Sequence, residues 1–265
     1  MGGPHLHLLV ELLYAVSGLV VGFIVGLTGV GGGSLMTPLL ILLFGIHPAT
    51  AVGTDLLYAA ATKTAGSAVH GFNKTIDWRI VLRLAAGSVP ASALTLWYLA
   101  TSGTQTAGAA HLLATILGSM LVVTALSLVF RGQIARFARS HREMQPGPQA
   151  VLTFITGAVL GALVSMSSVG AGAVGVTVLL LLYPNLPLLR IVGSDIAHAV
   201  PLTLVAGIGH WAIGDVDWHM LLSLLAGSIP GILIASRMAP HLDERIIRWL
   251  LAAVLTLVGL KLVFN

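Results

Sequence analysis

Residues 26–38 read GLTGVGGGSLMTP, and this stretch interrupts an otherwise apolar sequence near its start. Its glycines suggest a loop that holds a phosphate, but the pattern fits no nucleotide site. A dinucleotide fingerprint requires glycine or alanine where Ser34 stands. The phosphate loop of an NTPase requires Lys followed by Ser or Thr after its last glycine, whereas Leu35 follows Ser34 here. The stretch is therefore better explained as a break between two helices.

The composition places the chain in lipid rather than in water. Of its 265 residues, 57% are hydrophobic and only 8% are charged, and the mean hydropathy is +0.98. Soluble domains carry about 25% charged residues, so this chain lacks the side chains to cover a water-facing surface. The absence of cysteine excludes disulfides and thiolate metal sites. The net charge of +4 fits the basic cytoplasmic loops of a membrane protein, and we expect no nucleic-acid partner.

Apolar stretches of membrane-spanning length recur along the chain, since a spanning helix needs about 20 residues. They cover residues 8–27, 51–71, 78–100, 108–130, 149–167, 191–211, 218–239 and 246–264. Two shorter stretches, 35–46 and 174–184, each follow a glycine-rich break. The sequence therefore predicts an all-α polytopic membrane protein.

The second half of the chain repeats the first. With a shift of 140 residues, VGTD at 52–55 aligns with VGSD at 192–195, and Asp77-Trp78 aligns with Asp217-Trp218. AGSVP and AGSIP follow at corresponding positions. This similarity indicates a duplication, which is common among membrane transporters.

The duplication divides the chain into a first repeat over 1–130, a cytoplasmic linker over 131–148 and a second repeat over 149–265. Each repeat holds five segments, including one helix hairpin broken by glycines. Because five is an odd number, we expect two inverted five-segment repeats.

Basic residues give the expected orientation. If the linker lies in the cytoplasm, every Lys and Arg except Lys63 and Lys261 falls on the cytoplasmic side, as the positive-inside rule requires. We therefore expect a multi-pass protein of the inner (plasma) membrane with both termini extracytoplasmic.

The two glycine breaks form the expected substrate site. Non-helical backbone within hydrocarbon is tolerated only where protein or water covers it. A half-helix that begins near Ser34 would direct its amides, with their partial positive charge, toward an anion. The alternative is that the glycines only let helices pack closely. The predicted substrate-binding residues are Gly31, Gly32, Gly33, Ser34, Thr54, Lys63, Ser168, Gly170, Gly172 and Ser194.

Charged residues inside the predicted spans are the second group of candidates. Asp55, Lys63 and Asp195 lie in apolar segments, where a charge costs about 2.5 to 3.5 kcal/mol. Both aspartates could instead cap helices, but Lys63 has no such role. His198 lies three residues after Asp195 and shares its helix face. We therefore expect Asp55, Tyr58, Asp195 and His198 to act in proton coupling or gating.

No metal or other cofactor is expected, because the histidines lack partners at ligand spacing. The expected partners are a small anion, protons and the lipid bilayer, and a homodimer is left open.

Three stretches resemble the sulfite exporter TauE/SafE family, and the resemblance extends over about residues 18–262. They are GVGGGSLMTP, AVGTDLLYAAATKTAGSAVHG and IDWRIVLRLAAGSVP. The resemblance implies coupled transport of sulfite, thiosulfate or an organosulfonate. Many members carry serine in place of Asp55 and lack a lysine at position 63. This departure implies a subgroup with its own substrate or coupling.

Two other functions remain open. A passive anion channel would share the same fold. An intramembrane aspartyl hydrolase would use Asp55 and Asp195 as a catalytic dyad that shares one proton. Neither aspartate has the Tyr-Asp or Gly-x-Gly-Asp context of such proteases, and inverted repeats would bring them in from opposite faces. The sequence therefore favours a secondary transporter of a small sulfur-containing anion that works by alternating access, not an enzyme.

Overall fold

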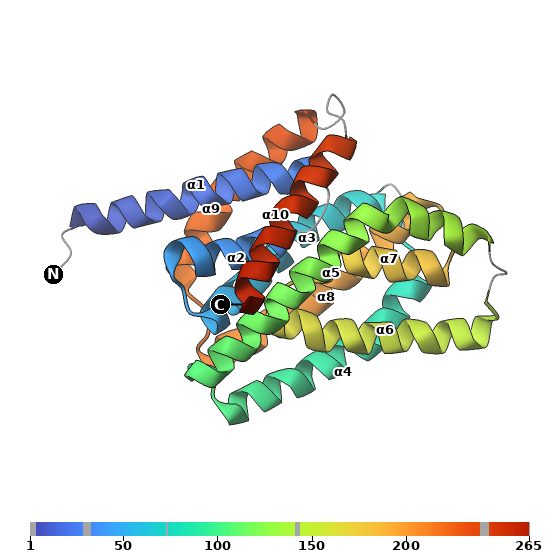
Figure 1. Ribbon diagram of the computed structural model, residues 1–265, viewed down its shortest axis with the longest axis horizontal. Coiled ribbons are helices and arrows are strands. Elements are labelled where there is room, and N and C mark those ends of the chain that lie inside the picture. The colour runs from blue at the N-terminus through green and yellow to red at the C-terminus, as the bar shows by residue number, and fades with distance from the viewer. Residues whose placement is uncertain (1–3, 29–32, 73, 141–143, 239–243, 265) are drawn as a thin grey trace.

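The computed structural model describes residues 4–28, 33–72, 74–140, 144–238 and 244–264. These ranges form ten helices and contain no strand (Figure 1). The helices are α1 (Pro4–Thr28), α2 (Gly33–Phe44), α3 (Pro48–Phe72), α4 (Trp78–Ser102), α5 (Ala107–Ser140), α6 (Pro146–Ser167), α7 (Ala173–Leu182), α8 (Leu188–Ile213), α9 (Trp218–Met238) and α10 (Glu244–Phe264). The prediction of an all-α fold is confirmed, and each apolar stretch corresponds to one helix.

Six of these helices are long and apolar enough to cross a membrane, within the described ranges. They are α1, α4, α5, α6, α8 and α9. Eight stretches of spanning length are expected from the sequence, and α3 and α10 are the two that are not among these six. Helix α3 carries two charged residues, Asp55 and Lys63, which lower its hydropathy.

The expected loop over 131–148 is much shorter in the structure. Helix α5 continues through Ser140, and α6 begins at Pro146. Alanine and arginine favour the helical conformation, and positive charge near a helix C-terminus is stabilised by the helix dipole. The basic segment after residue 130 therefore extends α5 beyond its apolar part.

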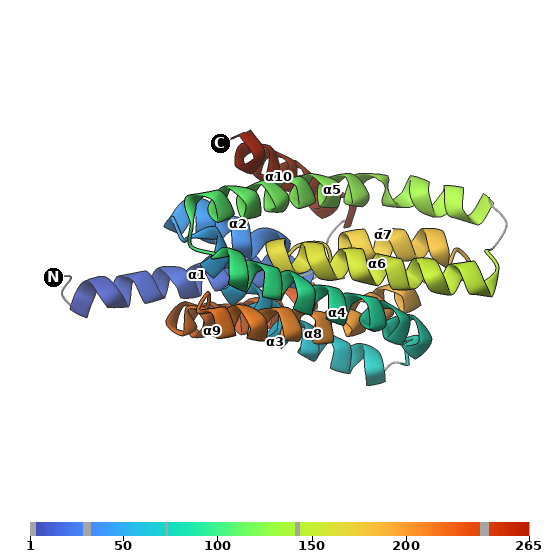
Figure 2. The same cartoon turned by 90° about the horizontal axis from the view of Figure 1, so that it is seen from below.

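Helices from the two halves of the chain pack against each other throughout the molecule. The most extensive contacts join α1 to α9, α4 to α6, α5 to α10 and α3 to α8 (Figures 1 and 2). Glycines allow two of these pairs to approach closely. A Cβ atom at Gly18 or Gly227 would overlap a backbone carbonyl across the α1–α9 contact, and one at Gly87 or Gly157 would do so across the α4–α6 contact.

Two hydrogen bonds of the same kind join the halves at the starts of helices. The Asp217 amide donates to the Thr54 hydroxyl at 3.1 Å, and the Asp77 amide donates to the Ser194 hydroxyl at 2.8 Å. Each aspartate side chain also accepts an amide from the first turn of its own helix, as an N-cap does. The starts of α4 and α9 are therefore fixed by residues from the other half of the chain.

Candidate functional site

The break between α6 and α7 has a backbone that only certain residues tolerate. Ser168 ends α6 in the left-handed conformation with φ 59°. Gly170 and Gly172 follow with φ values of 127° and 138°, in a region that side chains rarely adopt. The chain turns sharply within these residues, and α7 then begins at Ala173. The predicted helix break is thus present in the second half.

The corresponding break in the first half is described only at its end. Gly31 and Gly32 lie outside the described residues. Gly33 is the first residue of α2, and Ser34 in the first turn of that helix is buried.

Lys63 links helix α3 to the break in the second half. Its side chain is 9% exposed, and its ammonium group donates a hydrogen bond of 2.8 Å to the Ala171 carbonyl oxygen. The same ammonium group interacts electrostatically with the carboxylates of Asp55 and Asp195, without a direct ion pair to either. Lys63 therefore places a positive charge between the break and two buried carboxylates.

The Asp55 carboxylate is held by a neighbouring short helix. Its Oδ2 atom accepts a hydrogen bond from the Thr37 hydroxyl of α2, whereas its Oδ1 atom has no hydrogen-bond partner. The Ser168 side chain also faces this carboxylate from the break. Residues from α2, α3 and the α6–α7 break therefore meet at Asp55.

The Asp195 carboxylate is buried with no hydrogen bond to either oxygen. It lies directly against Gly175 of α7, where a Cβ atom would collide with Oδ1. The backbone of Gly172 faces it, and Lys63 and Arg131 act on it electrostatically. The two aspartates are not hydrogen-bonded to each other, so they do not form the close dyad that an aspartyl hydrolase uses.

His198 makes a different contact from the one expected. Its Nε2 atom lies 2.8 Å from the Ser88 hydroxyl of α4, while its Nδ1 atom has no hydrogen-bond partner. Tyr58 stands at the corresponding position of the first half and faces Ser228 of α9. The structure therefore brings His198 and Tyr58 each to a serine of the opposite half.

Thr54 and Ser194 are adjacent in sequence to the two aspartates, but their hydroxyls are already engaged. Each accepts the amide of a capping aspartate from the other half, as described above. The structure therefore uses both side chains in bonds between the halves.

Three contributors to this cluster carry little or no signal in the sequence. Thr37 gave one weak signal, a hydroxyl in an apolar half-helix. Arg131 was counted as part of a cytoplasmic loop, and its proximity to Asp195 depends on the continuation of α5. Ala171 contributes only a backbone carbonyl, which no sequence pattern marks.

A second buried polar cluster lies at the α8–α9 connection. The Asp215 Oδ1 atom accepts hydrogen bonds from Thr104 at 3.0 Å and Gln105 at 2.5 Å. Its Oδ2 atom lies 3.6 Å from His210 Nδ1, and His210 Nε2 donates to the Ser165 carbonyl at 2.8 Å. Burial alone would raise the pKa of Asp215, but the nearby His210 ring and the hydrogen bonds from Thr104 and Gln105 outweigh it and hold this pKa below its usual value.

In the described part of the chain, no three His, Asp or Glu side chains come together as a group that could hold a metal ion. The main cluster consists of an ammonium group and two carboxylates, which are groups that can bind charge and exchange protons.

Apolar helices of spanning length around buried charges define a multi-pass membrane protein. The sequence profile of the sulfite exporter TauE/SafE family matches residues 14–262, so the chain belongs to this family of membrane transporters. Its relatives include the probable membrane transporter protein YjnA of Bacillus subtilis, which is 40% identical over 93% of this chain and 97% of that protein.

Two further relatives carry the same description. The probable membrane transporter protein YdhB of Bacillus subtilis is 26% identical over 97% of this chain and 100% of its own length. A probable membrane transporter protein of Xylella fastidiosa is 27% identical over 90% of each chain. No solved structure matches the chain.

Proposed function

We propose that this transporter moves a small sulfur-containing anion, such as sulfite, thiosulfate or an organosulfonate, across the inner membrane by proton-coupled alternating access. The family supplies the class of substrate. The observation that carries the proposal is the buried cluster of Lys63, Asp55 and Asp195 at the α6–α7 break.

The charges of this cluster supply a mechanism for coupling. With both aspartates ionised, their charges balance those of Lys63 and Arg131, and an anion gains little by entering. Each proton bound by an aspartate leaves one positive charge uncompensated. One unit charge at 4 Å is worth about 4 kcal/mol at an effective dielectric constant of about 20. Proton binding would therefore favour anion binding strongly, and the two would move together.

The contacts between the halves support an inverted pair of repeats as the moving parts. The Ser194–Asp77 and Thr54–Asp217 bonds are equivalent under the shift of 140 residues. They lie near the α3–α4 and α8–α9 connections, which are at opposite ends of the molecule (Figure 1). Alternating access would follow from rocking of one packed group of helices against another around the α6–α7 break.

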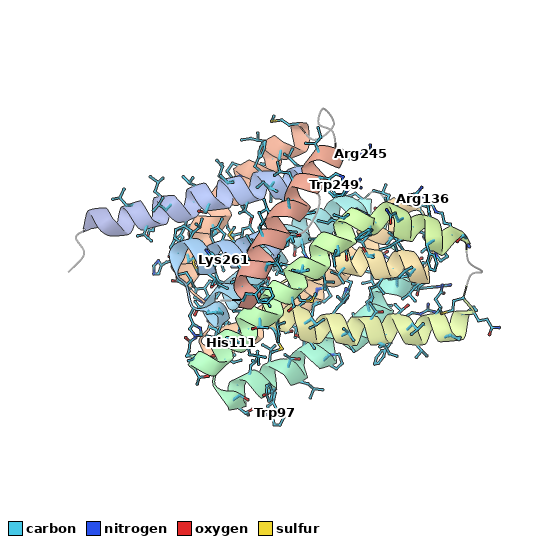
Figure 3. All side chains as sticks on the ribbon, viewed as in Figure 1. Trp97, His111, Arg136, Arg245, Trp249 and Lys261 are labelled. Carbon is cyan, nitrogen blue, oxygen red and sulfur yellow. The ribbon has the colours of Figure 1, made fainter. Side chains whose placement is uncertain are left out.

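The distribution of basic residues supports the proposed orientation. Figure 3 shows Arg136 and Arg245 toward the end of the molecule that carries the α5–α6 connection, whereas Trp97 and His111 lie at the opposite end. We assign the basic end to the cytoplasm and both termini to the other side of the membrane.

The test is uptake into proteoliposomes containing the purified protein. Sulfite, thiosulfate, sulfate, sulfoacetate and chloride are offered with and without a pH gradient. We expect saturable flux of at least one sulfur anion that increases with the gradient and shows counterflow exchange. Flux that rises linearly with concentration would indicate a passive channel instead. The absence of flux for all sulfur anions would contradict the proposal.

A further inference from the structure

The first turn of helix α7 contains backbone amide groups that have no hydrogen-bond partner. The Gly175 amide donates to the Gly170 carbonyl at 3.0 Å. Within the described ranges, the amides of Ala173 and Val174 have no acceptor. Such amides give a helix start a partial positive charge and free donors, which together favour an anion. The start of α7 therefore has the chemistry of an anion site.

A buried carboxylate already lies against this turn. The Asp195 Oδ1 atom is so close to Gly175 that a Cβ atom there would collide with it, and the backbone of Gly172 faces the same carboxylate. A Cβ atom on a helix points toward the helix N-terminus, so Oδ1 lies on the N-terminal side of Gly175. The Asp195 side chain is 1% exposed, and neither of its oxygens has a hydrogen-bond partner in the described part of the chain. Asp195 therefore takes the place that an anion bound to this turn would need.

The first half of the chain is built differently at the equivalent positions. Leu35 corresponds to Gly175 under the shift of 140 residues, and its side chain packs against the hydrophobic core. The Thr37 hydroxyl donates to Asp55, whereas its counterpart Thr177 donates to a carbonyl of its own helix at 2.7 Å. Of the two halves, the second therefore presents bare helix backbone to the carboxylate of the following helix.

We propose that the substrate anion binds at the first turn of α7, in the place that the Asp195 carboxylate occupies while the transporter is empty. The turn offers its free amides to a single anion, and two anions side by side would repel each other, so Asp195 and the substrate compete. The substrate enters once a proton neutralises Asp195, because the neutral carboxyl has no charge to hold it against the helix start. The identity of the anion rests on the proposed function, whereas the existence of an anion site at α7 does not.

The other charged groups near Asp195 attract an anion without fixing its position. Lys63 of α3 and Arg131 of α5 both act on Asp195 electrostatically. His198, on the same helix as Asp195, lies against the Ser88 hydroxyl. Because the two cations attract any anion in this region, the test has to distinguish competition for one place from attraction over a distance.

Two variants at the start of α7 make this distinction. Asp195→Ala removes the carboxylate and leaves a space that a small carboxylate ion such as formate can fill. Adding Gly175→Ala places a methyl group where Oδ1 stood, so the double variant fills the space without restoring the charge. Alanine favours the helical conformation at both positions. The double variant is therefore the matched control for Asp195→Ala.

The first measurement is the thermal unfolding temperature of each purified protein at neutral pH, in sodium formate or in sodium gluconate of equal ionic strength. A ligand that binds only the folded state stabilises it by mass action, so formate at about 100 mM should raise the unfolding temperature of Asp195→Ala by several degrees. The wild type and the double variant should each unfold at the same temperature in both salts. The absence of a response in Asp195→Ala, or an equal response in the double variant, would overturn the inference.

The second measurement is the half-saturating concentration of a transported sulfur anion in counterflow exchange, in variants that keep the volume of the side chain. Asp195→Asn removes the competing charge, so its apparent affinity at neutral pH should exceed that of the wild type by at least about 10-fold. Asp55→Asn removes an equal charge outside the proposed place, and its gain should be several times smaller. Equal gains would show attraction over a distance and would refute competition. If the wild type transports no sulfur anion but formate stabilises Asp195→Ala, the proposed substrate is wrong and the anion site stands.

Discussion

Helices α3 and α8 occupy equivalent positions in the two halves of the chain. They share the hydroxyl residues that bind the other half, but only α3 carries a lysine. Each carries, about two turns after its start, a hydroxyl that accepts the amide of an aspartate from the other half. Each also carries an aspartate in the next position and an aromatic ring three residues later. They differ farther along, where α3 carries Lys63 and α8 carries Thr203.

The two aspartates differ in a way that the sequence motif does not reveal. Asp55 is bound by the Thr37 hydroxyl, which stabilises its ionised form, whereas Asp195 has no hydrogen-bond partner. The shared residues therefore hold the two halves together. In the proposed mechanism we assign proton transfer to Asp195, the aspartate whose oxygens have no hydrogen-bond partner.

The largest expected effect tests this division between the aspartates. Asp195→Asn fixes the neutral form of the side chain, so flux driven by a pH gradient should fall to background while counterflow exchange persists. Asp55→Asn should retain part of the gradient-driven flux, because in our assignment Asp195 carries the proton. Both rates can be measured in the same proteoliposomes. Equal losses in the two variants, or full gradient-driven flux in Asp195→Asn, would contradict the assignment.

The next effect concerns the positions at which the two helices differ. Lys63→Gln removes a charge from the cluster, and a charge-assisted contact is worth about 1.5 to 3 kcal/mol. We therefore expect substrate affinity to weaken by about 10- to 100-fold. Thr203→Val is the matched control, since its hydroxyl bonds only within α8, and its affinity should stay within about twofold of the wild type. Unchanged affinity in Lys63→Gln would place the anion site elsewhere.

A smaller effect is expected at the hydroxyl residues that α3 and α8 share. Thr54→Val and Ser194→Ala each remove the acceptor of one bond between the halves. Each change should lower the free energy of unfolding by about 0.5 to 1.5 kcal/mol, with little change in substrate affinity. Thermal unfolding in detergent measures the first quantity and equilibrium binding the second. A large loss of affinity without a loss of stability would assign these hydroxyls to substrate binding.

The smallest effect concerns Asp215, whose counterpart in the first half is Thr75. Because the pKa of Asp215 is lowered in the folded state, its ionised form stabilises the fold at pH values above the unfolded pKa of about 3.9. This contribution decreases as the pH falls below that value toward the lowered folded pKa. The difference in unfolding temperature between wild type and Asp215→Asn should therefore be constant near neutral pH and decrease below about pH 4. A difference that grows on acidification would have the wrong sign.

The elements of this fold could be predicted because they depend on local chemistry. Apolar length, glycine breaks and capping aspartates set the starts and ends of the helices within a few residues. Residues 131–148 are the exception, because their charge predicts a loop, whereas their Arg and Ala residues favour helix and α5 continues through Ser140.

The contacts of the site could not be predicted in the same way. Lys63 donates a hydrogen bond to a carbonyl in the α6–α7 break, and His198 lies against a serine of α4. Both contacts depend on how the two halves of the chain pack against each other. Asp215 is buried and accepts hydrogen bonds from the α4–α5 connection, which is distant from it in sequence.

The glycine-mediated contact between α1 and α9 has a consequence for the biogenesis of the protein. Helix α1 ends at Thr28, whereas α9 begins only at Trp218. At about 5 to 20 residues per second, the ribosome needs roughly 10 to 40 s to synthesise the chain between them. During that time the first helix stays in the bilayer with its glycine surface uncovered, available to lipid, to insertion factors or to a quality-control protease. Chains that terminate before α9 would never cover this surface, which gives the cell a physical signal for recognising incomplete copies.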